Sequence, residues 1–377
     1  MLKPDRSVPT SADQAGASPL VSQREGTLGG SGHSDSPKKI VIMNHTNMLG
    51  HHFGCARVMR LLEDGLTDRG CQISGRLDGK LDWRNDNAAL AKLEDCDTIV
   101  INGEGTLHHG RKKAGWLMSV AAHEVTRDKE IALVNALFQA NPDSWIPLVQ
   151  RMKHLYCRDS RSATELSRMA GTEVTSFGDL STSAGPLPDT LPRSGVVVGD
   201  SVKGKVRNSL YSFAKELSRT TPTQIAPITI SFRELNPYKP LLSRFISRKV
   251  NALRQRRHEK AFPLLQYLDS EEDYIRVVRQ CRLHVTGRFH GVCLSLVTGT
   301  PFVCISSNSW KIEALFEDAG LDFRRVIDTS ELKPDAIINE DWTFSDTERK
   351  NISSFLDRSS AGANRMFDAI SGHPSIL

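Results

Sequence analysis

Short apolar runs alternate along most of this chain with longer segments in which apolar residues recur at helical spacing. Runs rich in valine and isoleucine are typical of strands buried in a parallel sheet, and the longer segments are typical of helices that cover it. The predicted strands are residues 40–43, 72–77, 98–102, 131–137, 155–159, 174–177, 195–199, 226–231, 283–286 and 302–305. The predicted helices include residues 87–93, 147–152, 162–170, 207–217, 290–297, 312–318 and 347–370. This alternation predicts an α/β fold.

The alternating pattern divides into two series. Residues 1–37 are rich in Ser, Gly and Pro and show no apolar periodicity, which predicts a disordered tail. We expect one Rossmann-like domain over residues 38–187 and a second over 188–340, joined by a proline-rich connector and facing each other across a cleft. A C-terminal helical segment is predicted over residues 341–377.

The pattern over residues 281–305 predicts a strand, a helix and a second strand. Arg288 and His290 lie where the first strand ends and the helix begins. In an open parallel sheet, ligands bind at the carboxyl ends of strands. The free N–H groups at a helix start add positive potential, and an arginine beside them suits a phosphate or a carboxylate. The structural alternative is that Arg288 forms an ordinary salt bridge and His290 caps the helix.

Two carboxylates also follow predicted strands. Glu104 lies between two glycines after the strand that ends at Asn102, so we interpret it as a catalytic base or as a residue that holds a sugar hydroxyl. The alternative is a turn glutamate exposed to water. Asp179 follows the strand over 174–177, and it is either catalytic or a helix N-cap and partner of Arg158.

The amino-acid composition argues against several classes of protein. The net charge of +5 is spread along the chain, and no zinc-finger or RNA-binding signature is present, which argues against a nucleic-acid binder. The seven cysteines include no CxxC pair and are typical of reduced core residues in the cytoplasm. No apolar run is long enough to cross a bilayer, and the start of the sequence lacks the apolar core of a signal peptide.

The loop after the first strand carries His45, His51 and His52 but no GxGxxG fingerprint, so no dinucleotide is predicted. Because no carboxylate stands at ligand spacing from these histidines, we predict no metal and interpret them as solvated or acceptor-binding side chains.

A basic helix is predicted over residues 244–260. Seven Lys and Arg residues are interleaved there with Phe245, Val250 and Leu253. The pattern favours a solvated helix face; the alternative is contact with an anionic membrane surface or an anionic acceptor.

From residue 38 to about residue 321 the chain resembles the polysaccharide pyruvyl transferase family, whose architecture is GT-B-like. The resemblance rests on four segments in order: Asn102-Gly-Glu-Gly-Thr, Arg158-Asp-Ser-Arg-Ser162, Arg288-Phe-His290 with its following helix and Gly-x-Pro turn, and Lys311 with its helix ending in Ala-Gly-Leu321. Three positions depart from the family pattern: Phe289 replaces the usual Leu, Glu104 stands where many members have Gly, and Asn308-Ser-Trp310 replaces a Tyr-containing stretch.

The resemblance implies transfer of the enolpyruvyl carbons of phosphoenolpyruvate onto a sugar diol as a ketal, with release of phosphate. The acceptor would be a sugar of a cell-surface polysaccharide or of its lipid-linked precursor, and neither a cofactor nor a metal is required. Under this interpretation Arg288, Lys311 and Arg158 hold the donor's anionic groups, His290 is the acid and Glu104 the base. Further substrate contacts are expected from Asn102, His45 and His51. We expect a cytoplasmic protein with an optional peripheral contact at the inner face of the membrane.

A second interpretation uses the same scaffold. The pair Glu104 and Asp179 resembles the carboxylates of retaining Kdo transferases, which use a nucleotide sugar such as CMP-Kdo. Asp179 would then be the nucleophile, and Arg288 and His290 would hold the donor phosphate. A third class is a binding protein without catalysis.

Overall fold

A computed structural model describes residues 36–48, 50–187, 192–306 and 309–373 of the chain. The tail predicted over residues 1–37 falls almost wholly outside these ranges, as do residues 188–191 of the predicted connector. Residues 37–377 form one compact unit.

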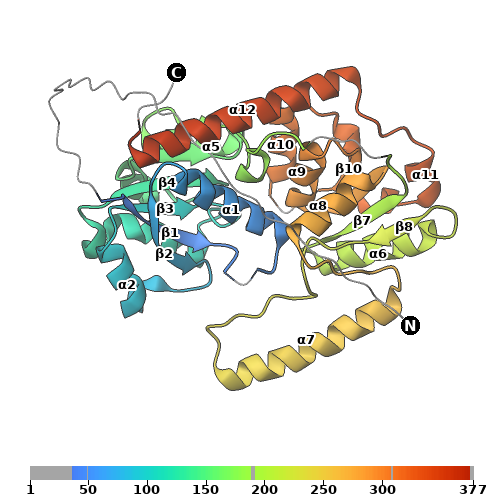
Figure 1. The fold of residues 1–377 in the computed structure, drawn as a ribbon, viewed down its shortest axis with the longest axis horizontal. Coiled ribbons are helices and arrows are strands. Elements are labelled where there is room, and N and C mark those ends of the chain that lie inside the picture. Colours follow the sequence, from blue (N-terminus) through green and yellow to red (C-terminus); the bar gives the residue numbers. More distant parts are fainter. Residues whose placement is uncertain (1–35, 49, 188–191, 307–308, 374–377) are drawn as a thin grey trace, which may run out of the picture. The chain divides into compact units, whose positions relative to one another are not determined.

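Two fully parallel sheets organise the unit (Figure 1). The first has the strand order β2-β1-β3-β4-β5-β6 and the second the order β11-β10-β9-β7-β8. The strands of the first sheet are β1 (Lys39–His45), β2 (Gln72–Asp78), β3 (Thr98–Asn102), β4 (Glu130–Ala136), β5 (His154–Cys157) and β6 (Thr175–Ser176). Those of the second are β7 (Val196–Ser201), β8 (Thr223–Ile225), β9 (Leu283–Gly287), β10 (Phe302–Ile305) and β11 (Val326–Ile327).

Helices connect the strands, as the parallel pairing requires. They are α1 (Phe53–Thr67), α2 (Asn87–Glu94), α3 (Lys112–Met118), α4 (Ile146–Gln150), α5 (Ser160–Ala170), α6 (Gly204–Leu217), α7 (Leu241–Ala261), α8 (Glu271–Gln280), α9 (Phe289–Val297), α10 (Lys311–Ala319), α11 (Pro334–Ile338) and α12 (Asp346–Ser371). Within the described ranges, no helix combines the length and the apolar character needed to cross a bilayer.

Both faces of each sheet are buried by helices, because successive strand residues point to opposite faces. On β1, Val41 and Met43 pack with α2 to α5, whereas Ile40 and Ile42 pack with α1 and α12. In the second sheet α6 covers one face, and α8, α9 and α10 cover the other. The continuous apolar runs of the sequence thus become strands with no solvent-facing side.

The strand predicted over residues 226–231 is wrong. The strand in that region is β8, which ends at Ile225. Pro227 follows and has no N–H to donate to a ladder. The next N–H, that of Ile228, donates instead to Oδ1 of Asp200 at 3.2 Å. The segment therefore leaves the sheet after one further bond, from Ala226 N to Val198 O.

Helix α12 packs on both halves of the unit. Its C-terminal residues Met366 and Phe367 belong to the apolar cluster of the first sheet. Its earlier residues Phe355 and Leu356 pack in the cluster formed by α9 and β10 of the second sheet. The chain crosses back over the first sheet in this way, as Figure 1 shows for the red helix.

A buried ion pair anchors the start of α12. Arg325 is fully buried, and its Nε and Nη2 donate to the two carboxylate oxygens of Glu348 at 2.8 and 2.9 Å. The guanidinium also lies 4.5 Å from the ring centroid of Phe344. Glu348 forms a capping box with Ser345 at the N-terminus of α12. One carboxylate therefore both starts the helix and ties it to the second sheet.

Arg325→Leu should destabilise the protein by about 3–5 kcal/mol, because it leaves the carboxylate of Glu348 buried without a counter-charge. Denaturant unfolding measures the loss. The matched control is Arg324→Leu, which removes an exposed pair with Glu340 and should cost less than about 1 kcal/mol. Adding Glu348→Gln, which keeps the capping box but removes the charge, should recover part of the loss. Equal effects of Arg325→Leu and Arg324→Leu would contradict the prediction.

Candidate functional site

The loops at the carboxyl ends of strands from both sheets enclose two adjoining cavities. The smaller, which we call the inner chamber, has a volume of about 240 Å³. The larger, which we call the outer chamber, has about 800 Å³. The inner chamber is lined by His52, Cys55, Glu104, Gly105, Arg158, Ser201, Val202, Lys203, Gly287, Arg288, Phe289, His290, Ser306 and Lys311. His52, Cys55, Ser201, Val202 and Arg288 also line the outer chamber.

The lining of the inner chamber is strongly cationic. Arg158, Lys203, Arg288 and Lys311 face a single carboxylate, that of Glu104. Low-dielectric walls strengthen the field of these side chains. The chamber is therefore suited to a small, multiply charged anion.

Arg288 stands between β9 and α9, as the sequence predicts. Its backbone N–H donates to Thr286 Oγ1 at 3.2 Å, and its Nε donates to Asp200 Oδ2 at 2.9 Å. Its Nη2 also donates to Asp200. Arg288 thus forms the salt bridge of the structural alternative and lines both chambers as well. Burial opposes the charge of Arg288, but Asp200 outweighs it and raises the pKa of the guanidinium.

Arg158 is 4 % exposed and lies over the ring of Phe289, with the guanidinium carbon 4.4 Å from the ring centroid. Its Nη1 donates to Asp179 Oδ2 at 3.4 Å. Its Nε and Nη2 have no hydrogen-bond partner in the part of the chain that the structure describes. Nε lies 3.9 Å from Asp159 Oδ2, an ion-pair contact without a hydrogen bond. Because buried donors are normally satisfied, both groups are suited to donate to a ligand.

Lys311 is the first residue of α10 and forms no ion pair with the residues that the structure describes. Burial, together with the charges of Arg158 and Arg288, lowers the pKa of its ammonium group to about 8. Its charge is therefore sensitive to pH near the physiological range.

Glu104 occupies a tight turn after β3. Gly105 has φ +61°, and a Cβ on Gly103 would lie 2.6 Å from the Cα of Ala136, so glycine is required on both sides. The carboxylate accepts from Thr46 Oγ1 at 3.0 Å, from the Cys55 thiol at 3.2 Å and from Asn102 Nδ2 at 3.3 Å. Glu104 is 7 % exposed, so the alternative of a turn glutamate exposed to water is wrong.

His290 lies in the first turn of α9 and points toward Glu104. Its Nε2 is 3.4 Å from Glu104 Oε1 and 3.7 Å from Asp179 Oδ1. It has no hydrogen-bond partner among the described residues. The N-cap of α9 is Arg288, without a side-chain capping bond, so His290 does not cap the helix. An acid–base pair thus joins the loop after β3 of the first sheet to α9 of the second.

Asp179 is fully buried behind this pair. Its Oδ1 accepts from Ser181 N at 2.9 Å, which makes it the N-cap of a short 3-10 helix, and its Oδ2 faces Arg158. Burial alone would raise the pKa of Asp179, but the charges of His290 and Arg158 and the bonds from Ser181 lower it. Asp179 lines neither chamber. The structure thus places it in the capping and Arg158-pairing role, and its catalytic role stays a prediction.

The remaining predicted residues lie apart from the inner chamber. Asn102 is fully buried, and its Oδ1 accepts from Glu104 N at 3.2 Å, so it supports the turn. His45 lines the outer chamber and its Nε2 lies 2.9 Å from Glu63. His51 also lines the outer chamber, faces Ser231 at 3.3 Å, and has its pKa lowered mainly by burial.

Sequence reasoning missed three residues that the structure brings to the site, Cys55, Asp200 and Lys203, and it interpreted His52, which lines both chambers, only as a solvated or acceptor-binding side chain. Asp200 and Lys203 directly follow the run of valines in β7, so the strand-end signal that selected Arg288 could have found them. Cys55 carried no such signal, because it lies in the first turn of α1, after His52 as the N-cap. His52 and Cys55, together with His290, hold three potential metal-ligand atoms within 4.8 Å of one another. His52 Nδ1 is engaged by Cys55 N at 3.3 Å.

Comparison with known proteins gives a family and a fold. A family model described as polysaccharide pyruvyl transferase matches residues 68–309. The comparison with curated proteins found no match. The chain is similar to the solved structure of a putative UDP-N-acetylglucosamine 2-epimerase from Listeria monocytogenes, with a TM-score of 0.53 and 11% identity over 89% of this chain and 96% of that chain.

The chain is also similar to MnaA of S. aureus, solved with UDP, at a TM-score of 0.50 and 10% identity over 88% of this chain and 96% of that chain. At such identities these likenesses show the fold alone. The predicted α/β fold with two Rossmann-like, GT-B-like halves is confirmed.

Proposed function

Because this chain belongs to the polysaccharide pyruvyl transferase family, we propose that it is a transferase that moves a pyruvyl group from phosphoenolpyruvate onto two hydroxyls of a sugar. The observation that carries the proposal is the inner chamber. It combines four cationic side chains with the pair formed by Glu104 and His290.

Phosphoenolpyruvate is a small molecule with a phosphate and a carboxylate close together. Arg288 stands at the start of α9, where the first N–H groups of the helix add positive potential for a phosphate. Arg158 offers two donors without a hydrogen-bond partner among the described residues, in the fork geometry that suits a carboxylate. Lys311 supplies a further charge on the same chamber.

Ketal formation needs one proton delivered and two removed. Carbon 3 of the donor gains a proton and becomes a methyl group, and both sugar hydroxyls form bonds to carbon 2. The bond from carbon 2 to the phosphate oxygen breaks, and phosphate leaves with the second hydroxyl proton. In this proposal His290 protonates carbon 3 and Glu104 accepts a hydroxyl proton. At 3.4 Å apart, the two groups can exchange the proton between steps.

The outer chamber suits the acceptor. Its volume of about 800 Å³ is large enough for a sugar, and it adjoins the inner chamber, with which it shares lining residues. Lys80 pairs with Glu234 on its wall. Arg207 and Arg233 on the same wall favour an acceptor that carries phosphate, such as a lipid-linked precursor of a cell-surface polysaccharide. His45 and His51 lie on the same wall.

The geometry favours this reaction over glycosyl transfer from a CMP-sugar. A nucleophile must reach the sugar carbon, whereas the carboxylate of Asp179 is fully buried and engaged by Ser181 and Arg158. We assign Asp179 a positioning role. It holds Arg158 on one side and faces His290 on the other.

The proposed setting is the cytoplasm, at the inner face of the membrane, with no cofactor and no metal ion in the reaction. All seven cysteines are described and all are free thiols, which is typical of a reducing compartment.

We expect Glu104→Gln to bind phosphoenolpyruvate about as well as wild type but to lose about 10²–10⁴-fold in turnover, because the amide cannot accept the hydroxyl proton. Calorimetric titration of phosphoenolpyruvate measures binding. Release of phosphate with a panel of glycosides that carry free diols measures turnover. No binding of phosphoenolpyruvate by wild type, together with CMP release from CMP-Kdo, would overturn the proposed function in favour of glycosyl transfer.

Donor binding should depend on the charge of Lys311. Below its pKa of about 8 the ammonium is protonated and attracts the donor; above that pH it becomes neutral. The affinity of wild type for phosphoenolpyruvate should therefore fall as pH rises from 7 to 9, approaching about tenfold per unit above the pKa. Lys311→Arg stays charged throughout and should show a flat profile. A wild-type affinity that does not change over this range would exclude Lys311 from the donor site.

The orientation of His290 depends on a glycine in α1. A Cβ added to Gly54 would lie 2.3 Å from both Cβ and Cγ of His290. Gly54→Ala should therefore displace His290 and lower turnover by about 10²-fold while phosphoenolpyruvate still binds. The control is Gly115→Ala in α3, where the added Cβ meets nothing within 4 Å. Near-normal turnover in a folded Gly54→Ala variant would show that the position of His290 is not critical.

A further inference from the structure

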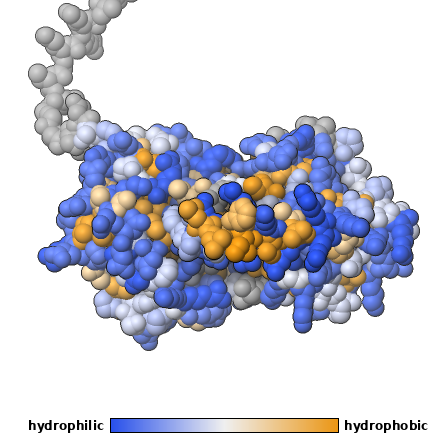
Figure 2. All heavy atoms as spheres, turned by 90° about the horizontal axis from the view of Figure 1, so that it is seen from below, coloured by the Kyte–Doolittle hydropathy of each residue, from blue (hydrophilic) through white to orange (hydrophobic). Residues whose placement is uncertain are grey.

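Helix α7 carries an unusual surface. All 21 of its residues are described, and none is buried. Figure 2 shows apolar side chains gathered at the centre of the face on which α7 lies. Its exposed apolar residues, with exposed fractions from 38 to 78 %, are Leu241, Leu242, Phe245, Ile246, Val250 and Leu253.

Helix α7 turns its polar side, and not its apolar side, toward the body of the protein. A surface helix normally turns its apolar stripe toward the core. In α7 the half-buried residues, which face the body, are all polar: Ser243, Arg244, Ser247, Asn251, Gln255 and His258. The apolar residues recur at the spacing of the opposite face. The stripe therefore points away from the core.

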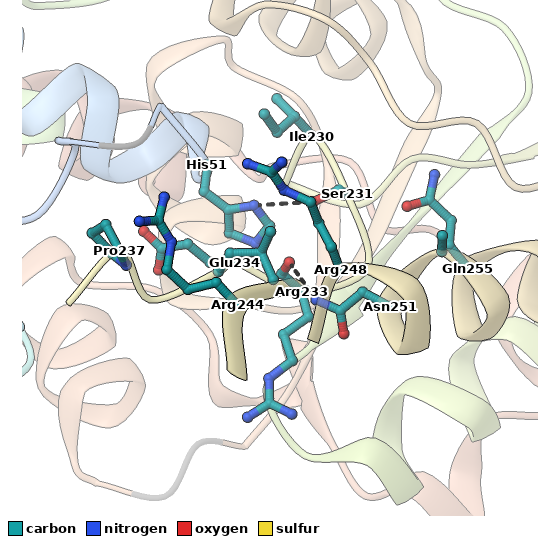
Figure 3. A pocket seen from close by; sticks show the side chains of 12 residues that line it. His51, Ile230, Ser231, Arg233, Glu234, Pro237, Arg244, Arg248, Asn251 and Gln255 are labelled. Atoms are coloured by element: carbon teal, nitrogen blue, oxygen red, sulfur yellow. Dashed lines mark hydrogen bonds between the residues drawn. The ribbon is translucent and has the colours of Figure 1, made fainter. Parts of the chain in front are cut away.

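Polar contacts hold α7 in this orientation. Asn251 Nδ2 donates to Arg233 O at 3.4 Å, and the ring of His258 lies 4.7 Å from that of Phe232. A cavity of about 420 Å³ separates α7 from the loop over residues 230–237 (Figure 3). Arg244, Arg248 and Gln255 line this cavity rather than an apolar interface. The apolar stripe thus takes no part in attaching the helix.

The charge of α7 indicates what covers the stripe. Seven Lys and Arg residues stand on the helix against one acid, Glu259. A second copy of this chain would bring an equally positive helix and be repelled. A nucleic acid would use the charges but would leave Leu242, Phe245 and Ile246 without a role. An anionic lipid surface uses both features.

We propose that α7 docks the protein on an anionic lipid bilayer. The helix would lie in the plane of the interface, with its apolar stripe inserted among the headgroups and its basic residues against lipid phosphates. The long stems of Lys and Arg allow their charges to stay at headgroup level.

Docking through α7 would also place the outer chamber close to the lipid. Arg254 of α7 lines that chamber, and His51 lines both it and the cavity beneath α7. An acceptor anchored in the bilayer would then reach the site without leaving the membrane. This last step rests on the proposed function, whereas the docking itself does not.

The test is sedimentation of the full-length protein with vesicles. Wild type should bind vesicles that contain phosphatidylglycerol at least about tenfold more tightly than vesicles of phosphatidylcholine alone, and added salt should weaken binding. The apolar variant combines Leu242→Ser, Phe245→Ser, Ile246→Ser and Leu253→Ser. The charge variant combines Arg256→Glu, Arg257→Glu and Lys260→Glu. Each should reduce binding to anionic vesicles at least about tenfold.

A matched control reverses three exposed charges away from α7, with Lys215→Glu on α6, Arg219→Glu in the turn after α6 and Lys350→Glu on α12, and should bind like wild type. Binding by the charge variant equal to that of this control would overturn the proposal. The proposal would also be overturned if wild type did not bind anionic vesicles but self-associated through the apolar stripe in analytical ultracentrifugation. Release of phosphate with a soluble glycoside, measured on the same proteins, distinguishes the two proposals. If wild type binds anionic vesicles but releases no phosphate, the proposed function is contradicted and the docking proposal is not.

Discussion

The candidate site depends on ion pairs that stabilise the positively charged side chains at the carboxyl ends of the two sheets. Desolvated guanidinium groups are costly unless they are paired. Asp200 engages Arg288, and Asp179 engages Arg158, and neither aspartate lines the inner chamber. The two aspartates offset the burial cost while the chamber remains a concentration of positive charge. Without them, two of the four cations that line the chamber would be buried without a hydrogen-bonded counter-charge.

The same arrangement explains why the acid–base pair needs both halves of the unit. Glu104 is fixed by a turn of the first sheet, through donors from Thr46 and Asn102. His290 comes from a helix of the second sheet and is held against Gly54 of α1. Neither half contains both groups. Helix α12, which packs on the clusters of both halves, therefore contributes to the distance between them.

The fold was readable from the sequence because fully buried strands leave continuous apolar runs. The strand predicted over residues 226–231 was wrong, because the spacing of apolar residues does not show that Pro227 lacks the N–H that a strand needs. Arg288 and Glu104 were predicted to lie near one another because chain order places strand ends at one edge of a sheet, whereas Lys311 was predicted only through the family resemblance. The partners of these residues were not found. Whether Arg288 pairs with Asp200, 88 residues away, depends on the order of β9 beside β7, which no local pattern contains.

The orientation of helix α7 on the body of the protein is also not contained in the sequence. Its mixture of basic and apolar residues is compatible with a solvated helix, because sequence alone does not say which side meets the body. Only the burial of each residue does so. The half-buried side is the polar one, which removes the usual explanation that the apolar residues support the core. An apolar stripe that stabilises nothing within the described chain, on a helix this positive, is better explained by an external anionic partner than by the fold.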